Sequence, residues 1–95
     1  MVSQNKIVNQ ITSKDIENWL VDYLANLLKL NHEEIDVKIP FQRFGVDSLL
    51  LVTMVSHLEE WLEIEILPTI MYDYPTIKTL SEYLAQEITD NTTEN

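Results

Sequence analysis

A shortage of helix-breaking residues constrains this chain more than any other feature of its sequence. Its 95 residues include one glycine and three prolines, so long segments can stay helical without interruption. After Thr12 and Ser13, either of which can cap a helix, apolar residues recur at the 3.6-residue helical period. These residues are Ile16, Trp19, Leu20, Tyr23, Leu24, Leu27 and Leu28. The sequence therefore predicts a helix that starts near residue 13.

A second helix is predicted over residues 48–62, because this run contains no Gly or Pro and Asp47 is placed to cap it. Projected at 100° per residue, one side of this helix is apolar and forms the predicted core face. That face consists of Leu51, Met54, Val55, Leu58 and Leu62. The arrangement leaves Ser48 outside the core.

Two prolines delimit the rest of the chain. Pro68 starts a short helical turn that ends before Pro75, and Thr76 caps a last helix. The apolar stripe of this last helix is Ile77, Leu80, Leu84 and Ile88. The predicted fold class is all-α, a small bundle of three main helices plus one short helix.

Between the first two helices, over residues 31–44, apolar residues no longer recur at the helical period. Ile35, Val37, Ile39 and Phe41 alternate with polar or breaking residues, which would suit a strand. No second strand is available to pair with it, so we expect a long packed loop whose apolar side chains lie against the helices. Both chain ends are polar, which predicts one domain over residues 13–88 between flexible tails at 1–12 and 89–95.

Charge restricts the partners. Sixteen acidic residues against six basic ones give a net charge of −10, which disfavours nucleic acid and membrane surfaces and favours a basic patch on a partner protein. There is no cysteine, signal-peptide pattern or apolar run long enough to cross a membrane. We expect a cytoplasmic monomer.

The sequence offers no catalytic or metal-binding motif. His32 and His57 fall in different elements, and one glycine cannot form a phosphate-binding loop. A metal-dependent hydrolase would need Asp47, Glu59 and His57 to converge, yet the projection puts His57 about 180° from Ser48. We expect no metal site and no enzymatic activity.

Beside Ser48, the projection gathers residues that the core does not use. They are Leu49, Val52, Ser56, Glu59 and Glu63. Apolar residues outside the core and ringed by charge commonly mark a partner site. These five residues form the predicted partner-binding face.

The segment Gly45–Leu49 resembles the signature of the acyl carrier and peptidyl carrier protein family, Gly-x-Asp-Ser-Leu at the start of a second helix. The resemblance continues through Leu58-Glu59 and the run 74–77, and covers roughly residues 13 to 88. It implies that Ser48 carries 4'-phosphopantetheine, and that Asp47 caps the helix and is recognised by the phosphopantetheinyl transferase. Acyl groups would then be held as thioesters and passed between partner enzymes.

Within this family, the stretch from Phe41 to Ile77 is similar to polyketide-synthase carriers, especially those associated with fatty-acyl-AMP ligases. Leu50 and Thr53 stand where fatty-acid synthase carriers are often acidic, and Leu51 replaces a small residue common in polyketide carriers. The implied partners are a transferase, an acyl-activating ligase and polyketide synthase enzymes. The alternatives are a peptidyl carrier of a nonribosomal peptide synthetase and an unmodified acidic helical interaction domain.

Overall fold

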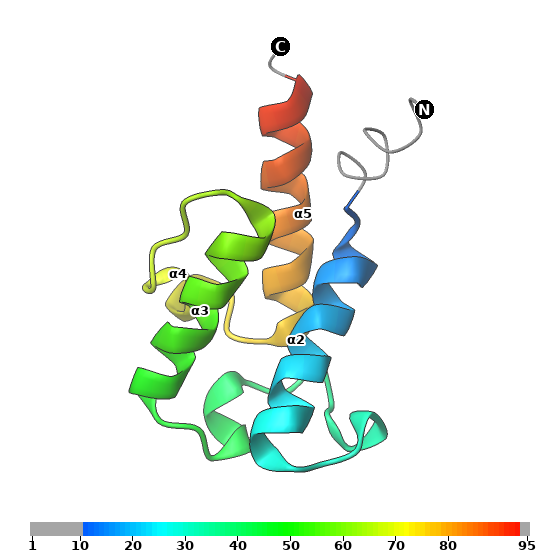
Figure 1. Ribbon diagram of the computed structural model, residues 1–95, viewed down its shortest axis with the longest axis vertical. Coiled ribbons are helices and arrows are strands. Elements are labelled where there is room, and N and C mark those ends of the chain that lie inside the picture. Colours follow the sequence, from blue (N-terminus) through cyan, green and yellow to red (C-terminus); the bar gives the residue numbers. More distant parts are fainter. Residues whose placement is uncertain (1–10, 94–95) are drawn as a thin grey trace.

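Three long helices enclose one apolar core (Figure 1). The computed structural model describes the backbone of residues 11–93 and the side chains of residues 11–89. In chain order the elements are α2 (Ser13–Leu28), the 3₁₀ helices η1 (His32–Glu34) and η2 (Phe41–Phe44), α3 (Ser48–Leu62), α4 (Ile70–Asp73) and α5 (Ile77–Thr93). Three long helices and one short α-helix, with no strand among the described residues, confirm the predicted all-α bundle.

The helices begin where the sequence predicts because local side chains cap them. Thr12 Oγ1 accepts a hydrogen bond from the Asp15 amide at 3.2 Å, and the Asp15 carboxylate accepts one from the Thr12 amide at 2.9 Å. Asp47 Oδ1 accepts from the Leu50 amide at 2.9 Å, and Thr76 Oγ1 accepts from the amide three residues later at 3.1 Å. All three predicted caps are therefore confirmed.

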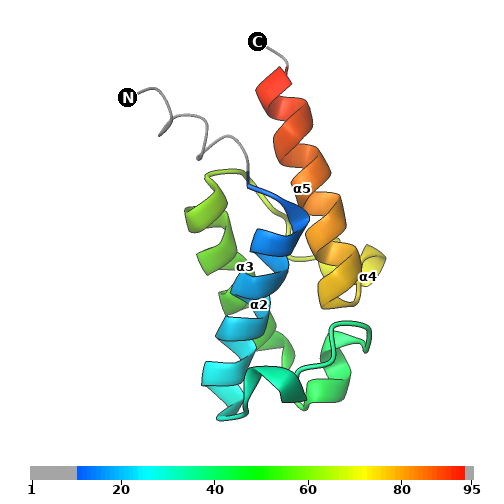
Figure 2. The ribbon, with the colours of Figure 1, turned by 90° about the vertical axis from the view of Figure 1, so that its right-hand side faces the viewer.

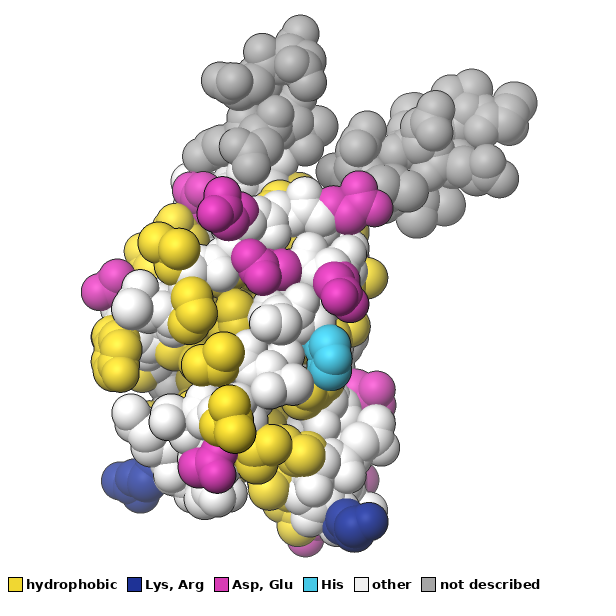
Figure 3. All heavy atoms as spheres, turned by 60° about the vertical axis from the view of Figure 1, so that its left-hand side comes forward, with side chains coloured by type: hydrophobic (Ala, Val, Ile, Leu, Met, Phe, Trp, Pro, Cys, Tyr) yellow, Lys and Arg dark blue, Asp and Glu magenta, His cyan; other side chains and the backbone are white. Residues whose placement is uncertain are grey.

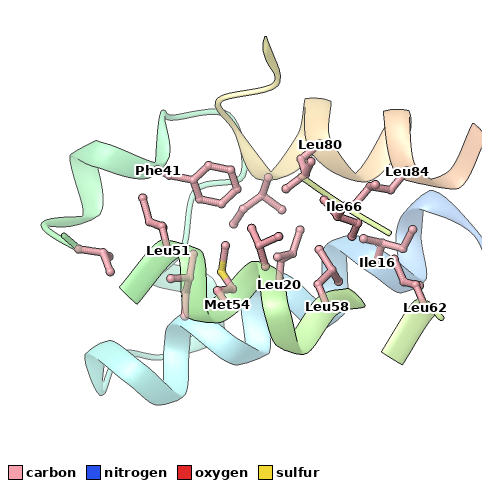
Figure 4. Close-up of a cluster of buried hydrophobic side chains, with 14 of the residues drawn as sticks. Ile16, Leu20, Phe41, Leu51, Met54, Leu58, Leu62, Ile66, Leu80 and Leu84 are labelled. Atoms are coloured by element: carbon pink, nitrogen blue, oxygen red, sulfur yellow. The ribbon is translucent and has the colours of Figure 1, made fainter. Parts of the chain in front are cut away.

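One face of each long helix supplies the core. The side chains from α2, α3 and α5 point toward one another in Figure 4, with Phe41 from η2 at one end of the cluster. The buried positions of α3 are the five predicted from its helical projection, Leu51, Met54, Val55, Leu58 and Leu62. In α2 the predicted stripe is only partly interior, because Trp19 and Tyr23 are half-buried and Leu27 is 36% exposed.

The segment between α2 and α3 is a packed loop, as predicted, with the two short 3₁₀ helices in it. Ile35 and Phe41 are buried, and Val37 and Ile39 are half-buried. Two backbone hydrogen bonds hold the loop to the start of α5: the Phe41 amide donates to the Pro75 carbonyl at 2.8 Å, and the Val37 carbonyl accepts from the Lys78 amide at 3.0 Å. The loop therefore closes one end of the bundle and lies next to the start of α3 (Figure 2).

The described part of the chain reaches into both segments that the sequence analysis assigned to tails, and the domain bounds stay a prediction. Ile11 is half-buried against the core and Thr12 caps α2, whereas residues 1–10 lie outside the described residues. Helix α5 continues to Thr93, beyond the predicted boundary at residue 88, because no Gly or Pro interrupts it. Within residues 11–93, no helix combines the length and apolar character that crossing a bilayer requires.

Helix α4 is attached to α5 by an aromatic pair. The rings of Tyr74 and Tyr83 stack with their centroids 4.3 Å apart. Desolvation at this contact raises the pKa of Tyr83, and the neighbouring Glu87 carboxylate adds to the effect. The stack fixes α4 on the side of the bundle where Ser48 lies.

Candidate functional site

Ser48 is the first residue of α3 and is exposed. The preceding helix η2 ends at Gly45, whose φ of 77° is a left-handed conformation that glycine adopts without strain. A Cβ atom at Gly45 would meet no atom within 4 Å, so backbone conformation and not lack of space favours glycine there. Val46 is then buried as an anchor, and Asp47 caps α3. This short turn presents the Ser48 side chain to solvent.

The start of α3 leaves hydrogen-bond donors available beside this serine. Asp47 accepts the amide hydrogens of Leu50, through Oδ1, and of Leu51, through its carbonyl. The amides of Ser48 and Leu49, and the Ser48 hydroxyl, have no hydrogen-bond partner within the described part of the chain. Free amides and the positive end of the helix dipole favour a negatively charged group such as a phosphodiester.

A cavity of about 210 Å³ adjoins Ser48 and lies among η2, the first turns of α3 and the segment around α4. Its apolar walls include Phe41, Val46, Leu51 and Met71. A slender chain attached at Ser48 could therefore lie against an apolar surface beside its attachment point.

Exposed apolar residues surround this cavity. Leu49 is 72% exposed and Val52 is 38% exposed, in agreement with the projection that placed both outside the core. Tyr72, which is 79% exposed, lines the cavity as Val52 does, and Leu67 at 65% exposure directly precedes Pro68, another residue of the cavity lining. Figure 3 shows hydrophobic side chains gathered over the face that carries α3 and α4. We call Leu49, Val52, Leu67 and Tyr72 the apolar rim.

The sequence analysis missed Leu67 and Tyr72, although a signal for Tyr72 was present. A helix of one turn such as α4 can turn only one side inward, and Ile70, Met71 and Tyr74 occupy that side. Tyr72 is the apolar residue left over. No sequence signal indicated that Leu67 is exposed, because its exposure depends on how the α3–α4 connection folds back.

Glu59, one of the five residues of the predicted partner-binding face, also makes a contact within the fold. Its carboxylate accepts a hydrogen bond from the Ile66 amide at 2.7 Å, and its side chain is only partly exposed. Because Ile66 is buried, this bond fastens the α3–α4 connection to α3. Glu59 therefore has a structural role in the fold, and its assignment to partner binding stays a prediction.

The two other polar residues of the predicted face lie at the surface. Ser56 is exposed. Glu63 is also exposed and is the C-cap residue of α3. It lines a hollow together with Trp19 and Trp61, away from the cavity beside Ser48. Only Leu49 and Val52 of the five predicted residues therefore belong to the apolar rim.

The histidines have partners far from Ser48. His57 Nδ1 lies 3.1 Å from the Tyr23 hydroxyl of α2, and His32 Nε2 lies 3.0 Å from the Asp22 carboxylate. With Glu59 bonded to the Ile66 amide, the three groups that a hydrolase would need do not converge. Among the described residues, no group of three or more acidic or histidine side chains could hold a metal ion.

Comparison with known proteins identifies the class that this fold and site define. The family described as "Phosphopantetheine attachment site" matches residues 18–84. The acyl carrier protein TtuC of Teredinibacter turnerae is 35% identical over 75 residues, which are 79% of this chain and 86% of TtuC. The polyketide synthase PksL of Bacillus subtilis is 34% identical over 67 residues, 70% of this chain but only 2% of that synthase.

A solved structure of a free-standing peptidyl carrier protein from Acinetobacter baumannii superposes with a TM-score of 0.75 at 30% identity. The superposition covers 81% of this chain and 96% of the peptidyl carrier protein. The chain therefore belongs to the phosphopantetheine-binding carrier protein family. Members of this family, which is generally non-catalytic, carry 4'-phosphopantetheine covalently, and carriers of the polyketide synthase type are among the relatives of this chain.

Replacing Glu59 with Ala should destabilise the fold by about 1.5 kcal/mol, because the substitution leaves the Ile66 amide without its charged acceptor. The matched control is Glu60→Ala, since Glu60 is exposed and its carboxylate makes no hydrogen bond within the described residues. This control should change stability by less than about 0.5 kcal/mol. Urea unfolding of both variants measures the difference, and equal stabilities would contradict the structural role of Glu59.

Proposed function

We propose that this chain is a non-catalytic acyl carrier whose 4'-phosphopantetheine arm is attached to Ser48. The observation that supports this most is the exposure of Ser48 at the first turn of α3, beside two free amides and an apolar cavity. Nothing in the described part of the chain competes for the Ser48 hydroxyl. The residues present therefore fit the group that the family carries.

The arm supplies a terminal thiol that holds an acyl group as a thioester. This chain contributes its attachment point and surroundings. The free amides of Ser48 and Leu49 stabilise the phosphodiester charge, while Asp47 keeps the first turn of α3 formed. The cavity walls offer apolar contact to the part of the arm nearest the serine. Tethering raises the local concentration of the acyl group at a partner active site to about millimolar.

Partner enzymes are proposed to dock on the apolar rim around Ser48. Side chains exposed by more than a third of their area, such as Leu49 and Tyr72, lose that exposure when a partner covers them. Ser56 lies farther along the same side of α3 and is exposed. The proposed partners are a phosphopantetheinyl transferase, an acyl-activating ligase and polyketide synthase enzymes. The cytoplasmic location expected from the sequence is part of this proposal.

For the source of the acyl group, we propose an adenylating ligase of the fatty-acyl-AMP type and not a malonyl transferase of primary lipid synthesis. The first turn of α3 carries no acidic residue, and Leu50 is 40% exposed. The Thr53 hydroxyl is turned back to the Leu49 carbonyl at 3.0 Å. A partner that relies on a basic patch would find little charge there. Similarity to the peptidyl carrier of Acinetobacter baumannii supports a second candidate, an aminoacyl carrier.

Incubation with coenzyme A and a permissive phosphopantetheinyl transferase should add one phosphopantetheine to the protein, because Ser48 is the exposed hydroxyl at the free helix start. Intact-mass measurement checks the addition. Ser48→Ala should remain folded and unmodified. An addition that persists in Ser48→Ala would contradict the assignment, and a wild-type chain that several transferases leave unmodified would favour the unmodified interaction domain.

Leu49→Ala and Tyr72→Ala should each lower kcat/KM of the transferase or ligase about fivefold while leaving the melting temperature nearly unchanged, because both side chains are mostly exposed. The matched control is Leu30→Ala, since Leu30 is 39% exposed but lies outside the cavity and the apolar rim. Steady-state kinetics with each variant measures the effect. Losses of activity that parallel losses of stability, or an equal loss in Leu30→Ala, would contradict the docking role.

Competition between loaders tests the proposed acyl source. The phosphopantetheinylated protein is offered a free fatty acid with ATP and a fatty-acyl-AMP ligase, malonyl-coenzyme A with a malonyl transferase, or an amino acid with its adenylation enzyme. Thioester formation is read by mass. We expect fatty acylation to dominate, because the first turn of α3 after the Asp47 cap carries no acidic residue for a basic partner patch. Efficient malonyl or aminoacyl loading without fatty acylation would refute the ligase proposal and leave the carrier assignment intact.

A further inference from the structure

A long trough runs along α2 on the side where the C-terminal end of α3 packs, and the proposed function does not use it. One hollow of about 880 Å³ is lined by Ile11, Trp19 and Trp61, among others. An adjoining hollow of about 400 Å³ extends along α2 to Leu27. Both hollows include Trp19 and Asp22, so they adjoin, and we call the two together the trough. Figure 2 shows α2 between α3 and α5, with its outer side toward the viewer.

Aromatic rings form the wall of this trough. Trp19 of α2 and Trp61 of α3 stack with centroids 5.6 Å apart and their planes 6° from parallel, and Tyr23 stacks on Trp19 at 5.3 Å. The core does not cover this wall completely, because Trp61 is 37% exposed and Leu27 is 36% exposed. Partly exposed, preordered aromatic side chains are typical anchors of protein interfaces.

The charge of the trough has one sign. Asp15, Asp22 and Glu63 line it, and all three are exposed. Among residues 11–89, no Lys or Arg side chain is part of its lining, and His32 is already bonded to Asp22 at 3.0 Å. A partner segment with basic residues beside an apolar stripe would therefore complement the trough. A second copy of this chain would instead bring its own acidic residues against those of the trough.

The length of the trough fits a helix. Asp15 and Leu27, the first and last lining residues within α2, are about 18 Å apart along the helix at 1.5 Å per residue, which is the length of roughly three helical turns. A hydrophobic groove of this length with charged edges suits an amphipathic helix laid along it.

We propose that the trough is a second docking surface, which binds a basic amphipathic helix of a partner protein. Along α3, Trp61 lies about 20 Å from Ser48 and about 140° around the axis. The trough shares no lining residue with the cavity beside Ser48. A partner helix held in the trough thus leaves Ser48 and the apolar rim open to an enzyme, so one protein can retain the carrier while another acts on it.

The test uses the full, unmodified chain and a synthetic peptide of about 18 residues in which leucine and lysine alternate with helical periodicity. Both tryptophans of the chain line the trough, so tryptophan emission reports binding, and titration calorimetry provides the affinity. We expect saturable binding with a Kd of about 10–100 µM. Trp61→Gln should weaken it at least about fivefold, and Glu63→Gln about twofold.

The matched controls separate this surface from the apolar rim. Leu49→Gln should leave the peptide affinity unchanged, and circular dichroism should show every variant folded. A peptide with glutamate in place of lysine should not bind. Absence of saturable binding up to about 1 mM, an equal effect of Leu49→Gln, or equal binding of the glutamate peptide would overturn the proposal. A concentration-dependent dimer that Trp61→Gln abolishes would instead assign the trough to a second copy and would equally overturn it.

Discussion

The one-sided apolar stripe of α3 is the constraint on which the rest of the structure depends. Five of its residues are buried, with Met54 and Leu58 almost completely inaccessible between α2 and α5. Burying this stripe fixes the rotation of α3, because a helix rotated by one residue would bring polar side chains into the core. With that rotation fixed, Ser48 must lie outside the core at the free start of the helix, next to the cavity.

What the sequence could predict was the part governed by local interactions. Thr12, Asp47 and Thr76 cap their helices through side chains within three residues, and the stripes of α3 and α5 follow a single period. The helix starts and the exposure of Ser48 were predictable for that reason. Helix α5 extends past residue 88, the predicted end of the domain, because polar composition alone does not stop a helix that lacks Gly and Pro.

Contacts between distant segments were beyond the sequence analysis. The bond from the Ile66 amide to Glu59 depends on how the connection after α3 folds back, so the helical projection gave no sign of this structural role. Likewise, Trp19 looked like a core residue in the α2 stripe, but it stacks on Trp61 at the edge of the bundle. A helical projection shows which side a residue is on and says nothing of its tertiary partner.

The distribution of charge around α3 is compatible with the apolar docking site proposed for this acidic chain. Its N-terminal turn carries no carboxylate, and Leu49 and Leu50 are exposed there, whereas Glu59, Glu60 and Glu63 lie toward the other end. Long-range attraction to a basic partner would thus act mainly through the distant end of α3, and contact at Ser48 would be mainly apolar. Charge that lies outside the contact accelerates encounter without slowing release, which suits a carrier that must visit several enzymes in turn.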